Sequence, residues 1–249
     1  MKLFPSNYIN GQIKYLRSTS ICEYDMKSAG MSILKAKKLL TQEQINELEA
    51  LPKEERNIRI GRLEQANEHI MREKNLGFKE YVTRFIVENR IPVECILTIK
   101  KDAVFLINQN PQILEFDEYV KFELKNQYTS YCNLSGKEFY YNGLLNILDT
   151  KGLGKEIAEK NKNSLLRDIS DLLGYAECFD KKYMFEKLKE YRSLYLNRKL
   201  PLESYRDLET GAYLYGEYQV DIITENELKD IDIRNNFIKY IHELIKAIL

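Results

Sequence analysis

The 249-residue chain has no tryptophan, only two histidines and four cysteines, and no formal net charge at neutral pH. Two histidines argue against a zinc site. The cysteines form no Cys-x-x-Cys pair and no disulfide framework, which indicates a reducing cytoplasm, the host cytoplasm for a viral protein. Zero net charge argues against wholesale coating of nucleic acid but leaves room for a local basic groove. No apolar run approaches transmembrane length, so we expect no membrane partner.

The composition is that of a soluble globular protein, since 44% of the residues are hydrophobic and 31% are charged. β-Prone runs form a meander from Tyr119 to Tyr141, and helical apolar stripes begin near Glu156. A domain boundary is therefore expected near Gly152–Gly154. The sequence predicts an α+β fold with an antiparallel sheet, followed by a mostly helical domain.

A largely helical insertion is expected at residues 35–90. Thr41 begins a capping-box pattern, and Pro52 can open a further helix that ends near Gly77. A third helix follows with a clean apolar stripe. The insertion carries several basic residues, which are more often an exposed helix face than a phosphate site: Arg56, Arg59, Arg62, Arg72 and Lys74.

Two aspartates stand at comparable places in the chain. Asp25 ends a short apolar run, and Asp102 lies near the tip of a predicted hairpin between the runs 95–99 and 103–107. If the strand before Asp25 pairs with this hairpin, both carboxylates project at one end of a sheet. Magnesium prefers hard oxygen ligands and keeps several waters, so two carboxylates are enough to bind it. The simpler alternatives are a helix cap at Asp25 and a solvated polar turn at Asp102.

The order of these motifs resembles the polymerase half of family B DNA polymerases. Asp25 is followed by Met26-Lys27-Ser28-Ala29-Gly30-Met31-Ser32-Ile33, in which the aspartate, both serines and the isoleucine match the first palm motif. Asp102 matches the second aspartate of the later Asp-Thr-Asp motif. Lys125-Asn126-Gln127-Tyr128 and Lys151-Gly152-Leu153 follow in the order of the family's subsequent motifs.

The resemblance implies an architecture and a two-metal reaction. It implies a palm at 1–34 and 91–153, reduced fingers plus a palm helix at 35–90, and a thumb-like domain at 154–249. Its cofactor would be Mg²⁺ or Mn²⁺, and its partners a primer–template, nucleoside triphosphates and a protein that supplies missing polymerase functions. The implied metal ligands are Asp25, Asp102 and the Met26 carbonyl. The implied nucleotide contacts are Ser28, Ala29 and Gly30. The triphosphate cations would come from the insertion: the segment that begins at Lys74 has the residue types of the family's fingers motif at compressed spacing, and Arg59 and Arg62, each three or four residues from another basic residue, compete with Lys74. The implied nucleic-acid contacts are Lys100, Lys101, Lys125, Tyr128, Lys151 and Gly152.

Two departures from the family pattern leave alternatives open. Lys100 stands where the family has the first aspartate of its later motif, and Gly30 stands where the family has the tyrosine that excludes ribose. The first hypothesis is a template-directed nucleotidyltransferase with weak sugar discrimination, acting alone or within a larger replicase. The second is a catalytically degenerate palm that binds nucleic acid or serves in assembly. The third is an unrelated α+β protein, in which Tyr128 simply packs the sheet.

Overall fold

The computed structural model describes residues 2–178, 181–207, 210–232 and 236–248. The chain divides into two compact units. The first unit comprises Met1–Gly11 and Ser20–Gln127, and the second comprises Gln12–Thr19 and Tyr128–Leu249. Both units combine helices with antiparallel strands, which confirms the predicted α+β class.

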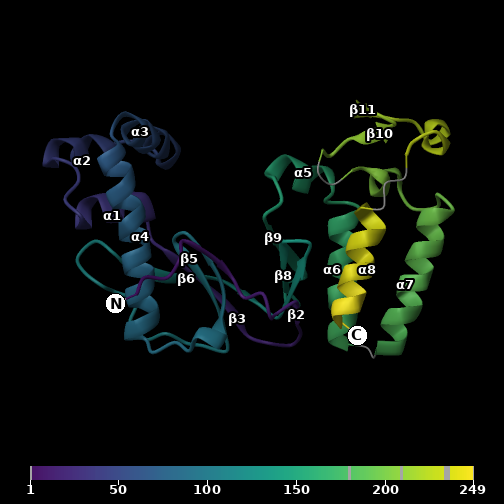
Figure 1. Ribbon diagram of the computed structural model, residues 1–249, viewed down its shortest axis with the longest axis horizontal. Coiled ribbons are helices and arrows are strands. Elements are labelled where there is room, and N and C mark those ends of the chain that lie inside the picture. Colours follow the sequence, from purple (N-terminus) through teal and green to yellow (C-terminus); the bar gives the residue numbers. More distant parts are fainter. Residues whose placement is uncertain (1, 179–180, 208–209, 233–235, 249) are drawn as a thin grey trace. The chain divides into compact units, whose positions relative to one another are not determined.

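The first unit is built on a five-stranded sheet with the order β1-β4-β5-β3-β6. Figure 1 labels three of these strands, β3, β5 and β6. The strands are β1 (Asn7–Ile9), β3 (Ile21–Met26), β4 (Ile96–Lys100), β5 (Ala103–Ile107) and β6 (Phe122–Tyr128). The predicted hairpin is confirmed, because β4 and β5 pair antiparallel and leave only Lys101 and Asp102 between them. The strand before the first motif, β3, pairs antiparallel with β5 in the same sheet.

Helices fill the interval between β3 and β4, as the sequence predicted. They are α1 (Ala29–Ala36), α2 (Gln42–Glu49), α3 (Lys53–Ala66) and α4 (Glu68–Glu88), with a short 3-10 turn η1 at Val93–Cys95. The capping box at Thr41 is present at the start of α2. One face of the sheet packs on α4, where Phe85 stacks against Phe122 of β6 and contacts Tyr24 of β3.

Gly77 does not end a helix, contrary to the sequence prediction. The break falls at Asn67 instead, whose side chain accepts hydrogen bonds from the backbone N–H groups of His69 and Ile70 at the start of α4. Gly77 lies inside α4, where a Cβ atom would come within 2.5 Å of Ile33 Cγ2 on α1. The glycine is thus explained by the close approach of two helices, which a local sequence pattern does not reveal.

The second unit packs helices on a four-stranded sheet with the order β2-β7-β8-β9. Its strands are β2 (Tyr15–Leu16), β7 (Ser130–Leu134), β8 (Lys137–Asn142) and β9 (Ile147–Lys151), and a separate hairpin joins β10 (Tyr213–Tyr215) to β11 (Tyr218–Val220). Its helices are α5 (Lys155–Lys160), α6 (Leu165–Cys178), α7 (Lys181–Leu196) and α8 (Asn236–Ile248), with 3-10 turns η2 (Leu202–Tyr205) and η3 (Glu225–Lys229).

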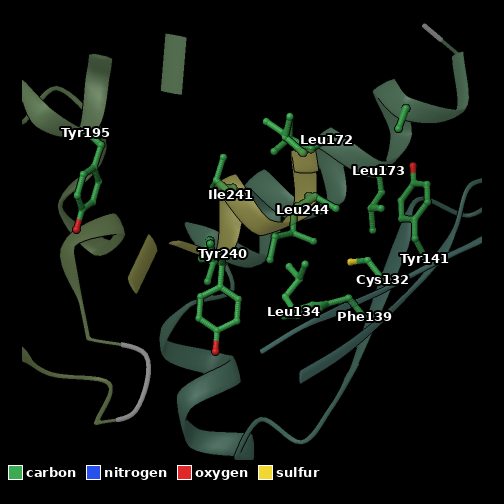
Figure 2. Close-up of a cluster of buried hydrophobic side chains, with 14 of the residues drawn as sticks. Cys132, Leu134, Phe139, Tyr141, Leu172, Leu173, Tyr195, Tyr240, Ile241 and Leu244 are labelled. Atoms are coloured by element: carbon green, nitrogen blue, oxygen red, sulfur yellow. The ribbon is translucent and has the colours of Figure 1, made fainter. Parts of the chain in front are cut away.

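The core of the second unit joins its sheet to α6 and α8. Figure 2 shows Cys132 and Leu134 of β7 beside Leu244 of α8, within one cluster of buried side chains. This packing explains why the observed division of the chain differs from the expected boundary near Gly152–Gly154. The predicted meander is divided between the units, because β6 belongs to the first sheet whereas β7 and β8 bury their apolar side chains against these helices.

We predict that Gly77→Ala destabilises the protein, by about 1–3 kcal/mol, because Ile33 is fully buried and has little room to move away from the added methyl group. Gly61→Ala is the matched control, since Gly61 also lies within a helix, α3, but a Cβ atom there meets nothing within 4 Å. The control should be stabilised by up to about 1 kcal/mol. Chemical denaturation measures both changes, and equal effects of the two substitutions would contradict the prediction.

Candidate active site

Asp25 is a strand residue at the carboxyl end of β3. It lies opposite Ala103 of β5, and the next residue, Met26, donates its backbone N–H to the Asp102 carbonyl at 3.1 Å. The following helix, α1, has Ser28 at its N-cap position, so the alternative in which Asp25 caps this helix is wrong. The strand pairing brings Asp25 and Asp102 to the same end of the sheet's strands.

Both aspartates line one cavity of about 220 Å³ in the first unit. Met26, Ser28, Ala29 and Gly30 line it as well, so these predicted residues are brought together. The complete lining is Asp25, Met26, Lys27, Ser28, Ala29, Gly30, Met31, Lys53, Arg56, Asn57, Asp102 and Glu123.

The electrostatics of this cavity are set by carboxylates that lie close together. Burial raises the pKa of Asp102 above its usual value, and the nearby negative charge of Asp25 raises it further. Lys125 of β6 balances part of this charge, since its Nζ donates to Asp25 Oδ2 at 2.8 Å. This hydrogen bond raises the pKa of Lys125. Lys125, predicted as a nucleic-acid contact, is therefore also the counterion of Asp25.

The sequence reasoning missed two further acidic residues: Glu123 of β6 lines the cavity, and Glu23 lies two residues before Asp25 on β3. Glu23 is only 1% exposed, and Asn126 donates its side-chain N–H to Glu23 Oε2 at 2.7 Å. Lys125 Nζ lies 3.6 Å from Glu23 Oε1. The pattern that would have revealed it is the period of two along a strand, which places residues 23 and 25 on the same face of β3.

The cations that face the aspartates come from the start of α3. Lys53, Arg56 and Asn57 line the cavity, and the sequence reasoning did not select them for it. Ile60 is the buried residue of α3, and its Cδ1 lies 3.7 Å from where a Cβ atom of Gly30 would be. Asn57, Arg56 and Lys53 precede Ile60 by three, four and seven residues and therefore share its helix face. The apolar Ile60 is thus the sequence signal that marks which basic residues of α3 face the cavity.

The three cations selected from the sequence lie elsewhere in the first unit. Arg59 lines a separate groove between α2 and α3, and Arg62 is exposed and does not line the aspartate cavity. Lys74 is 5% exposed and forms an ion pair with Glu64. None of these three residues lines the aspartate cavity.

The two lysines of the hairpin also differ in their surroundings. Lys100 of β4 and Asp25 of β3 both lie opposite Ala103 of β5, the strand between them. Their side chains therefore project from the same face of the sheet. Lys100 is not among the cavity's lining residues. The Lys101 ammonium lies 4.9 Å from the centre of the Phe78 ring on α4, and Asp102 is partly buried. Lys101 is exposed, as expected for a solvated turn residue, whereas Asp102 is partly buried and fits that alternative less well.

The remaining predicted contacts belong to the second unit. Tyr128 is buried, and its hydroxyl donates to Asp149 Oδ2 at 2.5 Å, which agrees with the packing role considered for it. Lys151 pairs with Glu138 across β9 and β8. Gly152 has a positive φ of 82° and lies against the Gly136 carbonyl, which makes it a turn residue of this sheet.

The donor set suits a hard cation that keeps its waters. In the described ranges, no group of three or more histidine, cysteine, aspartate or glutamate side chains is close enough together to hold a metal ion. Two carboxylates at one sheet edge nevertheless meet the needs of Mg²⁺, which usually binds one or two carboxylates together with water and substrate phosphates. Burial is the larger cause of the raised pKa of Asp102 and the negative charge of Asp25 the smaller one, and a bound cation would offset both by favouring the ionised carboxylate.

The fold and the cavity define an α+β protein with a carboxylate pair at a strand end, facing cations from a helical insertion. The chain belongs to the family described as the bacteriophage PBS1 gene 130 protein, which it matches over residues 2–249. No curated protein matches its sequence. None of the described helices is long and apolar enough to cross a membrane.

We predict that Asp25→Asn lowers the pKa of Asp102, because it removes the nearby like charge. The pKa should remain above its usual value, since burial is the larger cause of the shift. Carboxyl-carbon NMR titration in chelator-treated buffer measures both proteins. Asp117→Asn is the control, because Asp117 hydrogen-bonds within a separate turn, and an unchanged Asp102 pKa in Asp25→Asn would contradict the prediction.

Proposed function

We propose that this protein is a template-directed nucleotidyltransferase related to family B DNA polymerases, which extends a primer with nucleoside triphosphates. In this proposal the sheet of the first unit is the palm, α2 and α3 are reduced fingers, and the helices of the second unit form the thumb. It acts alone or as a subunit of a larger replicase. The observation that carries the proposal is the placement of Asp25 and Asp102 in one cavity, opposite Lys53 and Arg56.

The two sides of the cavity match the two needs of nucleotidyl transfer. Asp25, Asp102 and the Met26 carbonyl would hold Mg²⁺ or Mn²⁺, and Lys53 and Arg56 would bind the triphosphate. When bound, the ions supply a lower pKa for the primer 3′-hydroxyl and charge neutralisation for the leaving pyrophosphate. Arg56 offers a planar fork of donors that fits phosphate oxygens, and Lys53 adds a compact charge. Lys125 can hold the Asp25 carboxylate in position through its hydrogen bond.

A second candidate function is a catalytically degenerate palm that binds nucleic acid or serves in assembly. Two observations favour it. Lys100 replaces one acidic residue of the family pattern, and Lys125 already neutralises Asp25. In this case the cavity would retain its cations for phosphate contacts, which position nucleic acid without reading its sequence, and it would catalyse no incorporation.

Primer extension with labelled primer–template, nucleoside triphosphates and Mg²⁺ tests the proposal. We expect incorporation by the natural protein and a loss of at least about 100-fold in Asp25→Asn and in Asp102→Asn, the scale that follows removal of one preorganised electrostatic group. Glu118→Gln is the control, because Glu118 is exposed and does not line the cavity. Primer–template binding without incorporation by the natural protein would establish the second candidate instead.

The same assay separates the two arginine assignments. Arg56→Ala should raise the KM for the nucleoside triphosphate, because Arg56 lines the cavity. Arg62→Ala should leave KM unchanged, since Arg62 is exposed on the same helix and away from the cavity. The opposite result would return the triphosphate site to the residues expected from the sequence.

Gly30 gives a prediction about the sugar. It lines the cavity without a side chain that would clash with a 2′-hydroxyl, so the ratio of kcat/KM for deoxyribo- over ribonucleotides should stay below about 100. Gly30→Tyr should raise this ratio. Gly30→Ala is the control, because its Cβ would lie 3.7 Å from Ile60 Cδ1, an ordinary contact. Strong exclusion of ribonucleotides by the natural protein would contradict the prediction.

A further inference from the structure

A second polar cavity of about 350 Å³ lies at the other end of α1 in the first unit. We name it the Tyr119 site. Its lining residues are Lys35, Lys38, Leu40, Gln42, Ile45 and Tyr119. Leu40 and Ile45 are buried and form an aliphatic floor, whereas Lys38, Gln42 and Tyr119 are exposed. The site therefore combines an aromatic ring, an amide and ammonium groups around an apolar base.

The turn that carries Tyr119 is held by hydrogen bonds, and Tyr119 itself is 40% exposed. Asp117 Oδ1 accepts the backbone N–H of Tyr119 at 2.8 Å and that of Val120 at 2.7 Å. Tyr81 of α4 donates its hydroxyl to the other oxygen of Asp117. These bonds fix the backbone of the turn that carries Tyr119, so little backbone entropy is lost when the ring contacts a ligand.

The two lysines of the site differ in how their charge is balanced. Lys35 forms an ion pair with Glu49, and its Nζ lies 5.7 Å from the centre of the Tyr119 ring. Lys38 has a positive φ of 52° just after α1, which directs the chain out of the helix. It makes no ion pair within the part of the chain that the structure describes. Lys38 therefore supplies an uncompensated positive charge next to an exposed aromatic ring.

This combination matches a nucleotide. The ring can stack on a base, the Gln42 amide can meet a base edge, and the Lys38 ammonium can bind a phosphate. An acidic peptide would use the lysine but has no flat group for the ring. We propose that the Tyr119 site binds one nucleotide of a single-stranded nucleic acid, with the base on Tyr119 and the phosphate on Lys38.

The position of the site connects it to the candidate active site. Lys35 follows Gly30 by five residues on α1, and a helix rises about 1.5 Å per residue, so about 8 Å of helix separates the two cavities. A strand that enters the aspartate cavity can therefore reach Tyr119 within a few nucleotides. The role as a template contact rests on the proposed function, whereas the binding of single strands does not.

Fluorescence anisotropy with a labelled oligothymidylate tests the proposal. Tyr119→Ala should raise Kd by about 5- to 100-fold, the effect of losing one stacked base, whereas Tyr119→Phe should keep the affinity. Lys38→Ala should weaken binding and reduce the slope of log Kd against log salt by about 0.7, as expected for one lost phosphate contact. Tyr218→Ala is the matched control, because Tyr218 is 78% exposed in the second unit.

The result that would overturn the proposal is unchanged affinity in Tyr119→Ala, equal loss in Tyr119→Phe, or no binding by the natural protein. Equal binding of a polyglutamate peptide would assign the site to acidic peptides instead. If the protein incorporates no nucleotide but binds oligothymidylate through Tyr119, the proposed function is refuted and this inference is supported. If the protein is active but Tyr119→Ala binds normally, the proposed function is supported and this inference is refuted.

Discussion

The antiparallel register between β3 and β5 is the constraint on which the candidate active site depends. Asp25 faces Ala103, and the residues on either side of it, Tyr24 and Met26, are buried in the core that packs on α4. A slip of one residue would turn Asp25 into this core and the apolar side chains toward the cavity, which is strongly unfavourable. The hydrophobic core therefore fixes where the carboxylate lies, and the neighbouring turn then places Asp102 beside it.

Carboxylates brought together in this way repel one another, and the surrounding residues reduce that cost. Lys125 donates to Asp25 and lies near Glu23, while Asn126 donates to the other oxygen of Glu23. These partners come from β6, the strand next to β3 in the sheet. The pKa of Asp102 is raised mainly by burial and further by the negative charge of Asp25. Asp25 and Asp102 thus lie at the end of the sheet's strands toward which α3 presents Lys53 and Arg56.

Local patterns predicted those parts of the fold that depend on neighbours in sequence. The β4–β5 hairpin follows from two apolar runs around three charged residues, and the Thr41 cap follows from spacing alone. The role of Gly77 could not be predicted, because it is set by α1, more than 40 residues earlier in the chain. The sequence also did not reveal that β6 joins one sheet and β7 and β8 another, since β-prone segments do not specify which sheet they join. That Arg56 rather than Arg59 lines the aspartate cavity depends on which face of α3 packs on α1.

Lys100 departs from the pattern of the polymerases that the sequence resembles, and this departure bears on the charge around the candidate active site. Lys100 and Asp25 face the same side of the sheet, but β5 lies between their strands, and adjacent strands are about 4.8 Å apart. Lys100 therefore stands about 10 Å from Asp25 along the sheet and does not separate it from Asp102. Relative to that pattern, Lys100 replaces a negative charge by a positive one on the same sheet face, two strands away from Asp25. In the proposed function this change would weaken the attraction for cations, and metal affinity would then depend on the phosphates that Lys53 and Arg56 would bind.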